Sequence, residues 1–188
     1  YLTDIYANEN LVIIGAFLVL IDAVAVAGIS IVIYPVLKES NETLALGYVG
    51  ARIGESVLFS VNVIITLTLL TLSQEFTEAG TSDLVFYRTS GNVLLAAANW
   101  AYLLGLGLAF AISALSLNIV LYQSKLTPRW LSGWGLIGAI LVIVNFLLES
   151  FGNNPIEILF LPIALQEMVF AVWLIVKGFS LSSISTSG

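Results

Sequence analysis

The stretch Leu46-Gly-Tyr-Val-Gly-Ala-Arg52-Ile-Gly-Glu55-Ser-Val-Leu-Phe-Ser-Val-Asn62 carries two opposite charges three residues apart within an apolar run. At this spacing Arg52 and Glu55 share one face of a helix. In a membrane such a face must point toward protein or trapped water rather than toward lipid. The stretch therefore predicts a polar centre inside a bundle of membrane helices.

The composition indicates an integral membrane protein. Of the 188 residues 59% are hydrophobic and only 10% are charged, and the mean hydropathy is +1.04. These values lie outside the range of soluble globular domains. The net charge of −6 argues against a nucleic-acid partner. The chain has no Cys and no His, which excludes thiolate metal sites, His-ligated haem and His general bases.

Five apolar spans are each long enough to cross about 30 Å of hydrocarbon. They predict an all-α, polytopic bundle that forms a single domain over residues 1–179. Between the second and third spans we expect a polar connection at residues 74–91, with an interfacial helix near residues 84–88. A Ser-rich tail at 180–188 is expected to be disordered. The predicted spans cover residues 11–37, 46–72, 92–122, 130–148 and 156–179.

The basic residues predict the orientation of the bundle. Most of them fall at span ends on one side of an alternating topology, and most acids outside the spans fall on the other side. By the positive-inside rule the basic side is cytoplasmic, so residue 1 is expected outside and the C-terminus inside. The bases on the cytoplasmic side are Lys38, Lys125, Arg129 and Lys177.

Three segments carry a resemblance to a known family: Ala51-Arg-Ile-Gly-Glu55, Asn118-Ile-Val-Leu-Tyr-Gln-Ser-Lys-Leu-Thr-Pro-Arg-Trp130, and the ending from Glu167 to Phe179. They resemble DUF4386, a family of bacterial and archaeal membrane proteins, over nearly the whole chain. The resemblance implies a prokaryotic cytoplasmic membrane and a bundle of six spans, with one further helix expected before residue 7. It implies no activity.

Four ionisable residues lie within the spans and are the candidate site: Asp22, Arg52, Glu55 and Glu167. Counted from the cytoplasmic ends, Glu55 is about 13 Å deep and Glu167 about 15 Å deep, so Arg52 can lie between them if the second and fifth spans touch. Each charge at a helix centre costs about 2.5–3.5 kcal/mol on the insertion scale. One arginine cannot balance three acids, so we expect at least one of them to hold a proton.

This cluster has two interpretations. It either fixes helix register as a buried ion-pair network, with Asp22 protonated, or it binds protons or cations. The first interpretation predicts a non-catalytic structural, accessory or binding component of the membrane. The alternative is a small proton- or cation-coupled transporter or channel. No catalytic residue, cofactor or metal site is expected, since no nucleophile accompanies the acids.

Small residues predict where helices pack closely. Gly50 and Gly54 form a GxxxG motif, and a four-residue spacing links Ala97, Ala101, Gly105 and Ala109. Such stripes indicate packing within the chain or a face for other membrane subunits or further copies of the chain, in addition to the lipid bilayer. The amides within the spans are expected to hydrogen-bond between helices rather than to bind ligands: Asn62, Asn99, Asn118, Asn145 and Gln166.

Overall fold

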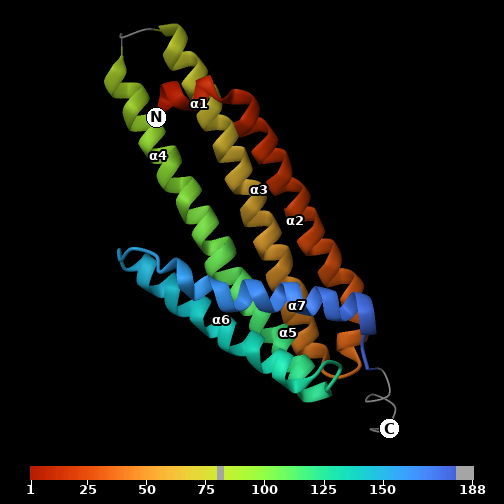
Figure 1. Ribbon diagram of the computed structural model, residues 1–188. Coiled ribbons are helices and arrows are strands. Elements are labelled where there is room, and N and C mark those ends of the chain that lie inside the picture. Colours follow the sequence, from red (N-terminus) through yellow and green to blue (C-terminus); the bar gives the residue numbers. More distant parts are fainter. Residues whose placement is uncertain (80–82, 181–188) are drawn as a thin grey trace.

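The computed structural model describes residues 1–79 and 83–180, and over these residues the regular structure is entirely helical. The predicted disordered tail, from residue 181 onward, lies outside the described residues. Figure 1 shows an elongated all-α bundle. Its elements are α1 (Leu2–Ala7), α2 (Glu9–Lys38), α3 (Glu42–Ala79), α4 (Leu84–Tyr102), a π-helical segment η1 (Leu103–Ala109), α5 (Phe110–Ser124), α6 (Arg129–Ser150), a 3₁₀ turn η2 (Glu157–Phe160) and α7 (Leu161–Lys177).

Among these residues, five helices are long and apolar enough to cross a membrane. They are α2, α3, the continuous helix from Leu84 to Ser124, α6, and the helix from Glu157 to Lys177. The helices extend beyond the apolar spans: α3 continues to Ala79 and α4 begins at Leu84. The connection is therefore shorter than the polar segment 74–91, because hydropathy marks the hydrocarbon boundary and not the end of a helix.

Helix α3 is the centre of the fold and packs against α1, α2, α4 and α5. The short helix α1 is attached near the far end of α3: Leu2 is buried, and the Ser73 hydroxyl donates a hydrogen bond to the Leu2 carbonyl oxygen. The hairpin of α6 and α7 packs on the α5 half of the third span and crosses the bundle obliquely (Figure 1). As a result, the α6–α7 turn lies beside the middle of the long α4–α5 helix.

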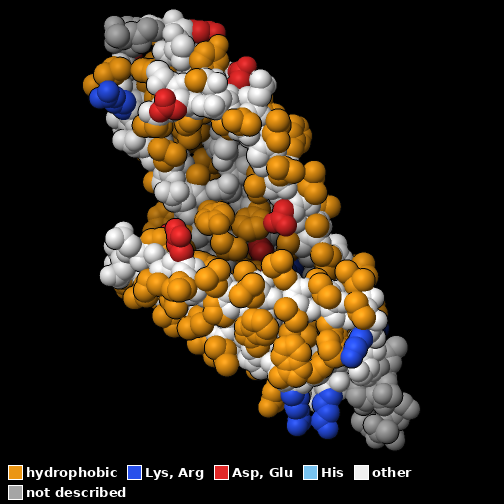
Figure 2. All heavy atoms as spheres, in the orientation of Figure 1, with side chains coloured by type: hydrophobic (Ala, Val, Ile, Leu, Met, Phe, Trp, Pro, Cys, Tyr) orange, Lys and Arg blue, Asp and Glu red, His pale blue; other side chains and the backbone are white. Residues whose placement is uncertain are grey.

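A hydrophobic core joins five helices near the end of the bundle that carries most Lys and Arg. Leu37 of α2, Leu121 of α5 and Leu131 of α6 are fully buried there, and Phe170 of α7 packs with them. Figure 2 shows basic groups clustered at this end, acidic groups at the opposite end, and a hollow between them halfway along the molecule.

The π-helical segment η1 changes which small residues of the third span face a neighbour. Gly105 packs on α3, where an added Cβ would lie 3.1 Å from the Phe59 ring. Two residues later Gly107 packs on α6, where an added Cβ would lie 2.7 Å from the Phe146 ring. A π-helical turn inserts extra backbone into the helix and so rotates the residues that follow.

The predicted four-residue stripe therefore does not form one continuous contact. Ala101 and Gly105 are buried, Ala109 is half-buried and Ala97 is exposed.

The GxxxG motif of α3 faces an open furrow. A Cβ added to Gly50 or Gly54 would have no neighbour within 4 Å. The furrow has a volume of about 440 Å³, and its opposite wall includes Leu104 and Leu108 of η1. Within the described residues, this motif does not bring two helices into close contact.

Candidate functional site

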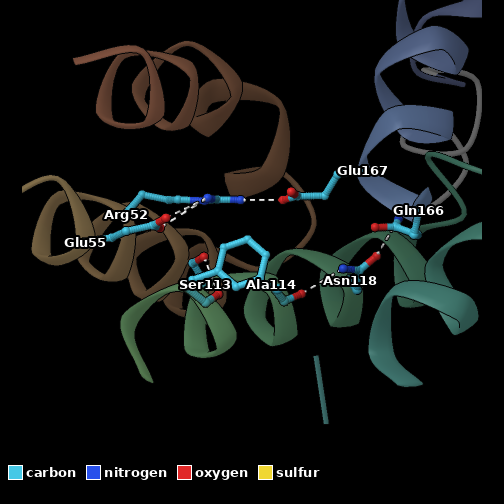
Figure 3. Close-up of polar contacts among 8 residues, drawn as sticks. Arg52, Glu55, Ser113, Ala114, Asn118, Gln166 and Glu167 are labelled. Atoms are coloured by element: carbon cyan, nitrogen blue, oxygen red, sulfur yellow. Dashed lines mark hydrogen bonds and ion pairs between the residues drawn. The ribbon is translucent and has the colours of Figure 1, made fainter. Parts of the chain in front are cut away.

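Arg52 of α3 joins two carboxylates from different helices (Figure 3). Its Nη1 lies 3.1 Å from Glu55 Oε2 on the same helix, and its Nη2 lies 2.9 Å from Glu167 Oε1 on α7. The first pair follows from the three-residue spacing on one helix face. The second forms because α3 and α7 run in opposite directions, which places the two residues at similar distances from the basic end.

The inner part of this triad is shielded from solvent. Arg52 is 9% exposed and Glu55 only 2%, whereas the Glu167 side chain is 43% exposed. The guanidinium also lies 5.1 Å from the centre of the Phe110 ring and 5.8 Å from that of Tyr48, within cation–π distance. Arg52 Nε is buried and has no hydrogen-bond partner among the described residues. Within this part of the chain, the triad thus retains one unused buried donor.

Asp22 lines the same cleft from α2 but does not join the triad. Its side chain is exposed and makes no hydrogen bond or ion pair with another described residue. The structure therefore brings together Arg52, Glu55 and Glu167 and places Asp22 apart from them on the cleft wall.

The cleft has a volume of about 970 Å³ and corresponds to the hollow in Figure 2. Two further acids line it, Glu149 at the end of α6 and Glu157 in η2. From the sequence alone both belong to the acidic outer ends of their spans. The oblique course of the α6–α7 hairpin instead places them in the same cleft as Arg52, and no sequence pattern indicates that tilt.

Aromatic side chains form much of the remaining wall. Phe59 of α3 and Tyr102 of α4 are stacked, with ring centres 6.3 Å apart. Phe110 and Phe160 line the cleft as well. The cleft thus combines five carboxylates, one guanidinium and several aromatic rings. In residues 1–79 and 83–180, no three acidic side chains lie close enough together to hold a metal ion.

The buried amides mainly connect helices. Asn62 Nδ2 donates to the Ala98 carbonyl oxygen at 2.8 Å, which joins α3 to α4. Gln166 Nε2 of α7 lies 3.4 Å from both Asn118 Oδ1 on α5 and the Leu131 carbonyl oxygen on α6.

Asn145 closes the α6–α7 turn by accepting a 2.7 Å hydrogen bond from the Ile156 backbone N–H. Asn99 is exposed and makes no side-chain hydrogen bond with another described residue. Four of the five amides therefore hydrogen-bond within the bundle, as expected for structural groups.

Comparison with known proteins places the chain in a family. Residues 1–178 match the model of the family described as Domain of unknown function (DUF4386). Comparisons with curated proteins and with solved structures returned no match. The matched region contains all the helices of the described residues and all the acids of the cleft. This integral membrane protein therefore belongs to the DUF4386 family.

Proposed function

We propose that this protein is a non-catalytic binding protein of the membrane whose acid-lined cleft receives a small organic cation. The observation that supports this most directly is the charge of the cleft, whose lining includes five carboxylates and a single guanidinium. Glu55 and Glu167 share the charge of Arg52. Within residues 1–79 and 83–180, the charges of the other three acids have no ion-pair partner.

These three acids, Asp22, Glu149 and Glu157, come from three different elements around the cleft. None of them makes an ion pair with another described residue. A cation entering the cleft would interact with several carboxylates at once, in surroundings where Coulomb attraction is stronger than in bulk water.

The aromatic wall favours an organic ammonium. Ammonium groups bind over aromatic faces, and quaternary ammonium ligands are commonly recognised by several rings. The rings of Phe59, Tyr102 and Phe110 line the cleft together with the acids.

Choline and its neutral isostere 3,3-dimethyl-1-butanol provide the test, with the purified protein in dodecyl maltoside and isothermal titration calorimetry as the readout. We expect binding of choline but not of the alcohol, because the two differ only in charge. Asp22→Asn should weaken choline binding about tenfold, the effect of losing roughly 1.4 kcal/mol. Glu78→Gln, which removes an exposed acid outside the cleft, is the matched control. Equal binding of choline and the alcohol would exclude a cation site.

We also propose that residue 1 lies outside a prokaryotic cytoplasmic membrane and that α7 ends in the cytoplasm. The asymmetry of Lys and Arg supports this orientation. Because the chain has no Cys, single cysteines can report it. In intact cells a membrane-impermeant maleimide should label Thr3→Cys and should reach Ser40→Cys only after permeabilisation. The reverse labelling pattern would show that the topology is the opposite of the one proposed.

A proton- or cation-coupled transporter is the second candidate. It is favoured by a second cavity, of about 420 Å³, which shares Arg52 and Glu167 with the cleft. In reconstituted vesicles this candidate requires cation-dependent flux that Glu167→Gln alters while the fold stays intact. Unchanged flux would exclude it. The prediction of an accessory subunit is tested by the native mass after gentle extraction, since stoichiometric foreign chains would support it.

A further inference from the structure

The second cavity is a groove between α2 and α7 that meets the acid-lined cleft at its inner end. Both are lined by Val26, Arg52, Ile163 and Glu167. The ion pair between Arg52 and Glu167 therefore lies at the junction of a charged cleft and a second, more apolar space.

The walls of the groove beyond this junction are mainly aliphatic. Ile29 and Ile33 of α2 form one side, and Ala171 and Leu174 of α7 contribute to the other. Ile29 is 54% exposed, and Ile175, at the far end of the groove, is 84% exposed. The groove is therefore open to the surface that these apolar helices present to lipid. Along α7 it extends about 12 Å from Glu167 to Ile175.

The junction offers a carboxylate to an incoming head group. Arg52 is about nine-tenths buried, and its Nε has no hydrogen-bond partner among the described residues. This Nε is a donor on a cation, so it can bind only an acceptor and gives no contact to an ammonium group. The Glu167 carboxylate is paired with Arg52 on one oxygen, and its side chain remains 43% exposed. A head group at this point can contact Glu167 directly while its apolar part lies in the groove.

We propose that the natural ligand is a single-chain cationic amphiphile, with its ammonium group in the acid-lined cleft and its alkyl chain in the groove between α2 and α7. This inference rests on the proposed function and specifies its ligand class. The charge of the cleft selects the head group, and the aliphatic walls beside Glu167 select the chain. Such a ligand would enter sideways from the bilayer rather than from water.

In micelles the dependence of affinity on alkyl-chain length does not test the groove, because each added methylene is stabilised by the micelle as much as by the groove. Photo-cross-linking reports position instead. The probe is dodecyltrimethylammonium with a diazirine near the end of its chain, and the control is dodecanol carrying the same diazirine. We expect the ammonium probe to label groove residues of α2 and α7 roughly tenfold more than the alcohol, the effect of one charge-assisted contact.

Blocking the groove separates this inference from the proposed function. Ala171→Trp should remove most labelling by the ammonium probe while choline binding in the cleft persists. Ile140→Trp, at an exposed position of α6 outside both cavities, is the matched control and should leave the labelling unchanged. Ile29→Trp on the opposite wall repeats the test if Ala171→Trp does not fold.

Equal labelling by the two probes, or labelling that neither groove variant reduces, would overturn the amphiphile proposal even if choline still binds. If choline also fails to bind and the two probes label the protein equally, the proposed cation-binding function would be refuted as well.

Discussion

Replacing Arg52 by methionine should destabilise the bundle far more than neutralising the acid on α7. Methionine replaces the unbranched part of the arginine side chain but lacks the guanidinium, so the charge and all the donors are removed. Glu55, only 2% exposed, would then be a buried carboxylate with no cation beside it. Glu167 would also lose its partner, but its side chain is 43% exposed and can be solvated.

The expected magnitudes follow from this difference in exposure. Removing one partner of a buried ion pair costs about 3–5 kcal/mol, because the other charge is left uncompensated. Exposed pairs contribute roughly 0–1 kcal/mol, so Glu167→Gln should cost less than about 1 kcal/mol. The double variant Arg52→Met/Glu55→Gln removes both buried charges together, and it should recover much of the loss seen in Arg52→Met.

The free energy of unfolding can be measured by titrating the protein in dodecyl maltoside with SDS, using tryptophan fluorescence as the readout. The wild type, Arg52→Met, Glu55→Gln and the double variant form one thermodynamic cycle around the buried pair, and Glu167→Gln is measured beside them. Two results would refute the reasoning: equal losses for Arg52→Met and Glu167→Gln, or a double variant no more stable than Arg52→Met.

Two further predictions concern close packing and a buried amide, and both are checked by the same unfolding assay. Gly138→Ala should lower the free energy of unfolding by about 1–3 kcal/mol, because the new Cβ would lie 2.9 Å from the Ile163 Cβ and 3.0 Å from its backbone. Gly54→Ala, where the new Cβ meets open space, is the control and should be neutral or slightly stabilising. Equal losses for the two variants would contradict this packing. Asn145→Ala should cost about 1–3 kcal/mol, since it leaves a backbone N–H of the α6–α7 turn without its acceptor. Asn153→Ala, at an exposed amide, is its control. A similar loss of stability in that variant would show that the buried amide contributes no more than an exposed one.

The parts of the molecule that depend on local spacing could be predicted from the sequence. The three-residue interval between Arg52 and Glu55 is enough to place both on one helix face, and counting rises from the basic ends puts Glu167 at the same depth. Alternating topology then makes a contact between α3 and α7 geometrically possible. The five spans follow in the same way from length and hydropathy, since 30 Å of hydrocarbon requires about 20 apolar residues.

The cleft could not be predicted in this way, because it depends on how whole helices are inclined. Counting residues along each helix predicts which side chains lie at the same depth only when the helix axes are parallel. The α6–α7 hairpin crosses the bundle obliquely, so Glu149 and Glu157 lie beside the middle of the long α4–α5 helix rather than at its outer end. The π-helical segment at 103–109 adds a rotation that no spacing of small residues reveals.

These two departures from a regular bundle also distinguish the acids of the cleft from those at the outer end. Glu75 and Glu78 lie on the outer part of α3, where water can solvate each charge at little cost. Glu149 and Glu157 are as polar in sequence, but the tilt places them around a cleft whose remaining walls are largely aromatic and aliphatic. Like charges that line one cleft disfavour each other, and in the proposed complex a bound cation would offset this effect. The tilt of the α6–α7 hairpin, which sequence analysis does not reveal, is therefore also the feature on which the proposed cation site depends.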